Sequence, residues 1–148
     1  MRIALAADHA GYVLKDELVR WLSDNGHEVE DLGTNGPESV DYPEFGSKLA
    51  RVVGSGGAER GIAVCGSGIG IAIAVNRDPR CRCAHVNEPL SAELARTHND
   101  ANVLALGARL VGPDMAKACV EAFLGAGFAG GRHQRRVDQL SQLLQESD

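Results

Sequence analysis

The sequence lacks the features of a membrane, exported or nucleic-acid-binding protein. Its 148 residues contain no run of about 18 apolar residues, the length needed for a transmembrane helix. The N-terminal apolar segment ends at Asp8 and His9 and is too short for a secretory signal. Acidic residues outnumber lysine and arginine by 20 to 15, whereas nucleic-acid or membrane-surface binding needs a basic field. We therefore expect a cytoplasmic chain that binds neither nucleic acid nor a membrane. Several arginines lie close together in the sequence, so a small anionic ligand remains compatible with the composition.

The sequence also lacks paired cysteines. Its four cysteines are Cys65, Cys81, Cys83 and Cys119, and no two of them form a CxxC motif. Without such a pair and without an export signal, we expect reduced thiols rather than disulfides. Cys119 falls in a helical apolar pattern, and Cys81 and Cys83 alternate within a predicted strand, so we interpret these three as small core residues.

What the sequence does contain is a regular alternation of short apolar runs and helical patterns. The predicted strands cover residues 3–7, 28–32, 61–65, 82–86 and 103–106. The predicted helices cover residues 12–25, 44–53, 69–75, 89–97, 113–124 and 132–145, with Asn87 as the cap of the fourth. Continuous apolar strands are typical of a parallel sheet buried on both faces. The pattern predicts an α/β fold: a single-domain three-layer α/β/α sandwich over residues 1–148 with a five-stranded parallel, Rossmann-like sheet. The order of the strands in the sheet does not follow from the sequence.

Polar residues follow three of the predicted strands, where parallel α/β sheets bind their ligands. They are Asp8 and His9 after the first strand, CGSGIG (Cys65 to Gly70) after the third, and GAR (Gly107 to Arg109) after the fifth. We expect these three groups to meet at the carboxyl edge of the sheet. His98 and Asn99 end the fourth predicted helix, and the sequence leaves open whether they reach that edge.

Three glycines, at positions 66, 68 and 70, indicate an anion-binding loop. Their G-x-G-x-G spacing differs from the dinucleotide fingerprint, and no Gly-Lys-Ser/Thr follows as in a Walker loop. Glycines allow close backbone approach, and the following helix would present free N–H groups and its positive dipole end. The same field favours the thiolate of Cys65, which would then act as a base or nucleophile. The alternative is that Cys65 is a packed residue at a strand end.

Two histidines stand beside polar residues, His9 after Asp8 and His98 before Asn99. Histidine suits proton transfer because it titrates near neutral pH. A structural or solvated role is the alternative for each histidine taken alone. A metal cluster of Asp8, His9, Cys65 and His98 is a further alternative, but no local ligand spacing supports it, so no metal is expected.

The C-terminal segment 130–148 combines an apolar stripe with basic residues. At about 100° per residue, four residues share one helix face: Val137, Leu140, Leu143 and Leu144. Arg132 and Arg136 flank this face, and two guanidinium groups at a helix start suit a phosphate. The alternative is a solvated basic turn in which Arg135 pairs with Asp138. Because the helix follows the glycine-rich joint GAGFAGG, its leucine face is able to pack on another subunit.

Six stretches in order resemble the ribose/galactose isomerase family, and within it the type B ribose-5-phosphate isomerases. They are DHAG (Asp8 to Gly11), DYP (Asp41 to Pro43), CGSGIG (Cys65 to Gly70), EPLSAELARTHND (Glu88 to Asp100), NVLALGAR (Asn102 to Arg109) and GGRHQRRV (Gly130 to Val137). Each motif alone is weakly specific, but together they cover nearly the whole chain. The resemblance implies reversible conversion of ribose 5-phosphate and ribulose 5-phosphate through an enediolate, without metal or cofactor.

The resemblance also implies roles for individual residues. Cys65 would be the base that moves a proton between C1 and C2, assisted by Ser67 at a position often held by threonine. Backbone N–H groups of the glycine loop would hold the enediolate oxygen, and His98 with Asp8 would open the furanose ring. The substrate-binding residues it implies are His9, Tyr42, Gly66, Gly68, Ile69, Gly70, Asn99, Arg109, Arg132 and Arg136.

The resemblance further implies a homodimer, or a dimer of dimers, in which two subunits share each active site. One branch of the family uses a glutamate a few residues after the cysteine position, where this chain has Ile71, so the cysteine branch fits. Allose 6-phosphate or galactose 6-phosphate is the alternative substrate, because sugar length depends on pocket depth. The alternative of another class is a non-catalytic nucleotide or sugar-phosphate binding module, which would have no use for a thiol beside an anion loop.

Overall fold

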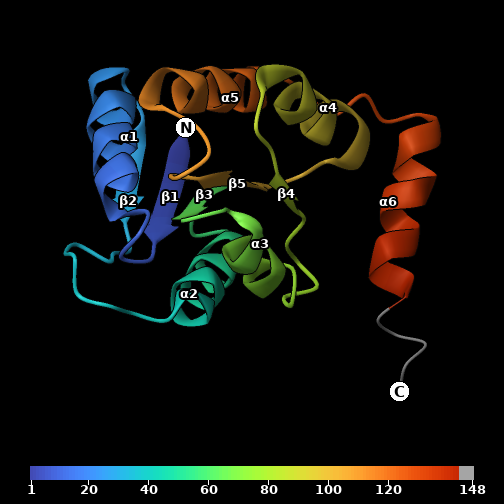
Figure 1. Cartoon of the computed structure of the whole chain (residues 1–148). Coiled ribbons are helices and arrows are strands. Elements are labelled where there is room, and N and C mark those ends of the chain that lie inside the picture. Colours follow the sequence, from blue (N-terminus) through green and yellow to red (C-terminus); the bar gives the residue numbers. More distant parts are fainter. Residues whose placement is uncertain (144–148) are drawn as a thin grey trace.

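A five-stranded parallel sheet forms the centre of the computed structural model, which describes residues 1–143 (Figure 1). Its strands are β1 (Arg2–Ala7), β2 (Glu28–Asp31), β3 (Arg60–Cys65), β4 (Cys83–His85) and β5 (Val103–Gly107). They lie in the order β2-β1-β3-β5-β4, and every pairing is parallel. The order reverses between β1 and β3, and such a reversal leaves a crevice at the carboxyl ends of the two strands.

Helices cover both faces of this sheet. They are α1 (Tyr12–Asp24), α2 (Tyr42–Gly54), α3 (Ile69–Val75), α4 (Pro89–Asn99), α5 (Pro113–Gly125) and α6 (Arg132–Gln142). α1, α4 and α5 bury residues such as Leu18 and Phe123 against one face, and α2 and α3 bury Leu49 and Ile71 against the other. The predicted three-layer α/β/α sandwich is confirmed. Within residues 1–143, no helix is both long enough and apolar enough to cross a membrane.

The two edge strands differ from the prediction of strands buried on both faces. The residues of β2 are mostly exposed, and those of β4 are only half-buried, whereas β1, β3 and β5 are almost completely buried. The reason is position, because an edge strand has a neighbour on one side only. In β2, Val29 alone packs against the core. The prediction was therefore wrong for the edges and right for the three central strands.

Two helix starts also differ from the prediction. α2 begins at Tyr42 rather than two residues later, because Asp41 is extended and Pro43 takes a place in the first turn, where proline is favoured. α4 is capped by Glu88 rather than by Asn87. The Glu88 carboxylate accepts a hydrogen bond from the Ser91 N–H at 2.9 Å, which satisfies one free donor of the first turn.

The helix α6 stands apart from the two layers, beside α4 and on the opposite side of the molecule from α1 (Figure 1). Val137 is its one buried residue among those described. Leu140 is 48% exposed and Leu143 63% exposed. The apolar stripe predicted for this helix is therefore mostly uncovered by the chain's own residues.

The polar contacts at the start of α6 also differ from one alternative considered above. The Asp138 carboxylate accepts a hydrogen bond from Gln134 Nε2 at 2.8 Å, in place of the Arg135 pairing. The predicted helix end at residue 145, and Leu144 of the stripe, lie outside the described residues.

Candidate active site

The carboxyl end of β3 carries the Cys65 thiol against the loop that opens α3. Cys65 is 4% exposed, and its Sγ accepts a hydrogen bond from the Gly68 N–H at 3.1 Å. Gly68 is left-handed (φ 80°), and a Cβ there would lie 2.8 Å from the Leu106 carbonyl carbon, so only glycine suits the position. The Ser67 hydroxyl accepts the next donor, the Ile69 N–H, at 3.2 Å. The loop thus aims a backbone donor at the sulfur, where it stabilises negative charge.

Two further side chains lie against the same loop. A Cβ at Gly66 would be 3.1 Å from Arg109 Nη1, and a Cβ at Gly70 would be 2.7 Å from Tyr42 Cζ. These two glycines therefore permit close approach by a guanidinium group after β5 and by a phenol ring at the start of α2. The arginine brings a positive charge to the loop, and the tyrosine brings a hydroxyl.

The turn after β1 is fastened to β3. The Asp8 N–H donates to the Val64 carbonyl at 3.2 Å. Gly11 approaches so closely that a Cβ there would lie 2.4 Å from the same carbonyl oxygen. The Asp8 carboxylate, 6% exposed, accepts hydrogen bonds from the N–H groups of Ala10 and Gly11 at 3.0 and 3.1 Å. This turn therefore stands in the crevice between β1 and β3.

His9 is oriented by the backbone of the segment that leads to α2. Its Nδ1 accepts a hydrogen bond from the Val40 N–H at 3.2 Å. When the ring is neutral, its proton is therefore carried by Nε2. That N–H remains available to donate to a ligand.

The same segment is anchored at its other end by Lys15 of α1. The Lys15 side chain is fully buried, and Nζ donates to the two carboxylate oxygens of Asp31 at 2.7 and 2.8 Å. Nζ also donates to Asp16 at 2.7 Å and to the Asn35 side chain at 3.0 Å. A buried ammonium group needs such partners, because an unpaired charge away from water is strongly unfavourable. Lys15 therefore ties the loop after β2 to the core.

These residues form one group, which we call the cysteine cluster: Asp8, His9, Tyr42, the loop 65–70 and Arg109. As the sequence predicted, the residues that follow β1, β3 and β5 meet at the carboxyl edge of the sheet. Tyr42 joins them from α2. The cluster offers a thiol, a carboxylate, an imidazole, a guanidinium group and several backbone donors. Such a set is suited to moving a proton beside a bound anion.

The remaining predicted site residues lie around the end of α4 and the start of α6. We call them the histidine cluster: His98, Asn99, Arg132 and Arg136. All but Arg132 line a hollow of about 270 Å³, together with His133, Val137 and Leu140. The rings of His98 and His133 are stacked, with centroids 4.4 Å apart and planes 11° apart. Burial lowers the pKa of His133, and the neighbouring positive groups of the cluster lower it further.

Within one chain the two clusters lie at opposite ends of the sheet. Cys65 ends β3, at the carboxyl edge. α4 runs back along the sheet, and Asp100, which follows it, accepts two hydrogen bonds from Arg82, just before the start of β4. The 11 residues of α4 span about 16 Å, which is longer than a pentose phosphate. His98 and Asn99 therefore do not reach the carboxyl edge in their own chain, which the sequence had left open.

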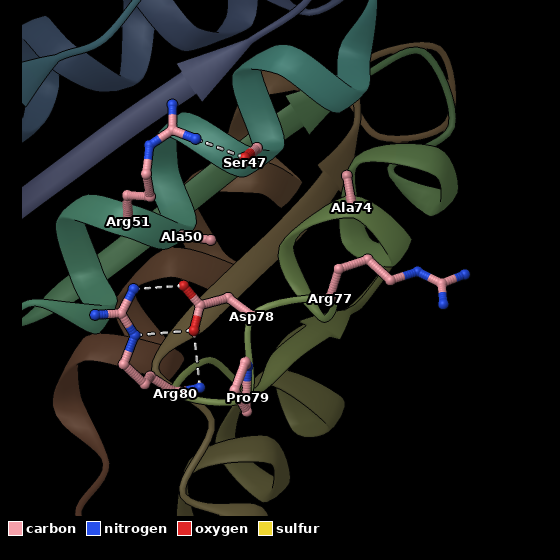
Figure 2. Close-up of a pocket in the computed structure, with 8 residues that line it drawn as sticks. All are labelled: Ser47, Ala50, Arg51, Ala74, Arg77, Asp78, Pro79 and Arg80. Carbon is pink, nitrogen blue, oxygen red and sulfur yellow. Dashed lines mark hydrogen bonds and ion pairs between the residues drawn. The ribbon is translucent and has the colours of Figure 1, made fainter. Parts of the chain in front are cut away.

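A hollow of about 380 Å³ lies away from both clusters, between α2 and the segment that joins α3 to β4 (Figure 2). It is lined by three arginines, but their side chains diverge. Arg80 is bound to the Asp78 carboxylate at 3.0 and 2.7 Å, and Arg51 donates to Ser47 at 2.9 Å. Figure 2 shows Arg77 pointing away from the other two. The hollow therefore presents no convergent set of donors to a ligand.

The metal cluster considered from the sequence is not assembled. Residues 1–143 contain no group of three or more His, Cys, Asp or Glu side chains placed to hold a metal ion. The proposed ligands are divided, because His98 lies at the opposite end of the sheet from Asp8 and Cys65.

The other three thiols behave as core residues. All the cysteines are free, with Cys81 and Cys119 buried and Cys83 half-buried. Burial raises the pKa of Cys81 to about 11, and burial also raises the pKa of Cys83 and of Cys119. At neutral pH they are therefore protonated thiols, as expected of structural cysteines.

Two histidines near the clusters were missed by the sequence reasoning. His133 lies between Arg132 and Arg136 in one turn of α6. Its position in the same helical turn as these two predicted site residues could have identified it from the sequence. His85 Nε2 is buried and has no hydrogen-bond partner within the described chain. It lies beside the glycine loop, since a Cβ at Gly68 would be 2.9 Å from it. No sequence signal pointed to His85, because the contact depends on the order of β4 and β5 in the sheet.

Comparison with known sequences decides the family. The sequence model of the family described as Ribose/Galactose Isomerase matches residues 3–140. This chain belongs to that family. It is 46% identical over 144 residues to the protein named ribose-5-phosphate isomerase B of Escherichia coli strain K12, covering 97% of both chains. It is 39% identical over 148 residues to the putative sugar phosphate isomerase YwlF of Bacillus subtilis strain 168, covering 99% of both.

Solved structures of family members share the whole fold. Clostridium thermocellum ribose-5-phosphate isomerase B superimposes with a TM-score of 0.98 at 47% identity, covering 100% of both chains. The Mycoplasma genitalium ribose-5-phosphate isomerase B, solved with bound ribulose-5-phosphate, superimposes with a TM-score of 0.94 at 37% identity. That match covers 98% of this chain and 97% of the other. The Rossmann-like architecture predicted from the sequence is confirmed.

Proposed function

We propose that this chain interconverts ribose 5-phosphate and ribulose 5-phosphate. The observation that carries the proposal is the Cys65 thiol, held 3.1 Å from the Gly68 N–H in a loop of backbone donors. Family membership and close relatives named ribose-5-phosphate isomerase B support the same reaction. A packing role alone does not require a donor aimed at the sulfur.

In the proposed reaction Cys65 is the base. With the open-chain aldose bound, the thiolate takes the proton from C2, the C–H electrons form the C1=C2 bond, and negative charge moves to O1. The proton then returns to C1. O1 gains a proton and O2 loses one, which leaves the ketose carbonyl at C2. Aldose and ketose are isomers, so no net electron transfer occurs and we propose no cofactor and no metal.

The glycine loop stabilises the enediolate. We assign this role to the backbone N–H groups of Gly66, Gly68, Ile69 and Gly70, of which those of Gly68 and Ile69 donate to Cys65 Sγ and to the Ser67 hydroxyl in this structure and would turn to the substrate oxygen. One donor of this kind contributes roughly 3–4 kcal/mol to the barrier reduction in other enzymes. The Ser67 hydroxyl, beside the Ile69 N–H, assists at the sugar oxygens.

The cyclic sugar must open before this chemistry. A proton leaves O1, the C1–O4 bond breaks, and O4 receives a proton, which yields the open aldehyde. We assign these transfers to His98 acting with Asp8. We assign phosphate binding to His9, Arg109, Arg132 and Arg136, and contacts with the sugar to Tyr42 and Asn99.

These roles require two chains, because His98 and Asp8 lie at opposite ends of the sheet in one chain. We therefore propose a homodimer, alone or as a pair of dimers. In it, the histidine cluster of one subunit completes the cysteine cluster of the other. Leu140, 48% exposed on α6, would be buried on the partner. Residues 1–148 would then act as one isomerase domain whose segment 130–148 contributes residues to the active site of the partner subunit.

The free thiols suit the reducing cytoplasm, where we place the protein.

Subunit mixing tests the shared site. Equal amounts of Cys65→Ala and Arg132→Ala protein are mixed, subunits are allowed to exchange, and activity is assayed with ribose 5-phosphate well below KM, where both variants are weakly active. A mixed dimer carries both lesions in one site and neither in the other. Because half the dimers are mixed and each has one intact site, about a quarter of wild-type activity should return. No recovery after proven exchange would mean that one chain supplies both residues to a site.

The reaction itself is tested with purified protein, EDTA and a series of aldose phosphates. Ribose 5-phosphate should be converted to ribulose 5-phosphate. Faster turnover of allose 6-phosphate or galactose 6-phosphate would show that a six-carbon sugar phosphate, and not ribose 5-phosphate, is the preferred substrate. Binding of sugar phosphates without turnover of any would favour a non-catalytic binding module.

A further inference from the structure

His98 of the histidine cluster is stacked on the neighbouring imidazole of His133. The His98 ring at the end of α4 lies almost parallel to the His133 ring of α6, with centroids 4.4 Å apart and planes 11° apart. His98 is the residue to which ring opening is assigned above, whereas His133 has no role in that reaction. α4 and α6 are therefore in contact through the His98 ring, whose orientation matters for the proposed proton transfer.

An imidazole at a helix end needs such a neighbour to act in a fixed direction. The torsion that turns a histidine ring about Cβ–Cγ is broad, so an unsupported ring samples many orientations. Proton transfer requires a nitrogen within about 2.6–3.2 Å of its partner atom. A flat neighbour restricts the ring to the plane of the stack. It leaves the nitrogens at the ring edge available to the substrate.

The character of the second ring also suits this task. Burial and the positive groups around it lower the pKa of His133, so its ring is neutral at neutral pH. A neutral ring adds no repulsion when His98 gains a proton. A lysine or arginine side chain in the same place would oppose that step.

We propose that His133 is a positioning residue that holds the His98 ring for opening the cyclic substrate. This inference rests on the proposed role of His98. It assigns to His133 no contact with the reacting atoms. The shape and neutrality of the side chain matter, and its nitrogens do not.

Three variants separate shape from hydrogen bonding. His133→Phe keeps a neutral flat ring without nitrogens, His133→Asn keeps a polar side chain without an aromatic ring, and His133→Ala removes both. Arg135→Ala, at an exposed position two residues along the same helix, is the matched control. Circular dichroism and oligomeric state verify that each variant is folded and assembled.

Two activities are compared for each variant: turnover of ribose 5-phosphate, which is mostly cyclic, and deuterium exchange at C1 of ribulose 5-phosphate, which is open. In His133→Ala and His133→Asn, turnover should fall roughly 10- to 100-fold, the size of loss that follows a misplaced group. His133→Phe should stay within about threefold of wild type, and C1 exchange should be unchanged in all three. A loss in His133→Phe equal to that in His133→Ala would overturn the inference in favour of direct contact through nitrogen. Equal losses of exchange and turnover, or no loss in any variant, would overturn it as well.

A readout independent of activity keeps this test separate from the proposed reaction. The NMR signals of the His98 ring protons should lose the ring-current shift of their neighbour in His133→Ala and His133→Asn and keep it in His133→Phe. If these signals behave as expected and wild-type protein isomerises no sugar phosphate, the proposed function fails and the positioning contact stands. If they do not change in any variant, the positioning contact itself is overturned.

Discussion

The cysteine cluster and the histidine cluster are built in opposite ways. The first is held by main chain: strand ends, a left-handed glycine and turns whose donors are already paired around nearly buried Cys65 and Asp8. The second stands on helix ends, and its α6 helix is anchored to its own chain through Val137. A rigid frame suits groups that must meet a reacting carbon, because small displacements there are costly. Arg132 and Arg136, which we assign to phosphate binding, tolerate more freedom, whereas His98, which we assign to proton transfer, is supported by its stack on His133.

The largest effect that this comparison predicts is at the centre of the cysteine cluster. Cys65→Ala should lower kcat at least about 1,000-fold, because the base is removed while the donors and the phosphate contacts remain. Ligand binding and the unfolding midpoint should be nearly unchanged. Steady-state assays and isothermal calorimetry with ribose 5-phosphate measure the two quantities. Cys81→Ala, which removes a buried thiol away from the loop, is the control and should keep normal kcat. Near-normal turnover of Cys65→Ala would show that the cysteine cluster does not contain the base.

A second prediction concerns the support of the rigid cluster. Asp31→Ala should lower the free energy of unfolding by about 3 kcal/mol, because it leaves the fully buried Lys15 ammonium group without the carboxylate that binds it through both oxygens. Lys117→Met, which breaks a surface ion pair with Glu17, should cost less than about 1 kcal/mol. Urea denaturation of both variants gives the comparison. Equal losses would show that the buried network contributes no more than an exposed pair.

A third prediction tests the softer cluster. Arg136→Ala should raise KM with little change in kcat, since phosphate is held equally in the ground state and the transition state. The loss of one charge-assisted contact should cost about 1.5–3 kcal/mol, or about 10- to 150-fold in KM. Arg135→Ala, one residue away and outside the hollow, should leave KM unchanged. A fall in kcat instead of a rise in KM would place Arg136 at the chemical step.

The smallest effect is expected at the structural thiols. Raised pKa values keep Cys81, Cys83 and Cys119 protonated at neutral pH, and a protonated thiol reacts poorly with iodoacetate. At pH 7, iodoacetate should therefore modify Cys65 and leave these three unlabelled, with substrate protecting Cys65. Labelling of Cys81 should rise only as the pH approaches about 11, where its thiolate forms. Mass spectrometry of peptides after timed labelling measures the order, and Cys83 reacting as fast as Cys65 would contradict it.

The sequence predicted the rigid cluster better than the softer one, for a physical reason. Apolar runs and glycines are local signals, so the pattern alone places Cys65 correctly at the end of a strand and Gly68 at the start of the next helix. The position of His98 depends on the direction of α4, and the meeting of His98 with His133 depends on how the C-terminal joint folds back. The charged residues Glu28, Glu30 and Asp31 already indicated that β2 is exposed, but its place at the edge of the sheet depends on strand order, which hydrophobic pattern does not encode. Capping by Glu88 rather than Asn87 was a local choice between adjacent polar residues.

The placement of two half-built clusters at opposite ends of one sheet has a consequence for the rate law. In the proposed shared-site dimer, an isolated chain carries every residue assigned to catalysis but brings no complete set together, so a single copy would be inactive until it pairs with another. In the dilute range, where most chains are single, activity should rise with the square of chain concentration. It should become proportional to concentration once nearly all chains are paired. The activity of such a dimer near its dissociation constant would then depend on the concentration of the chain as well as on the concentration of substrate.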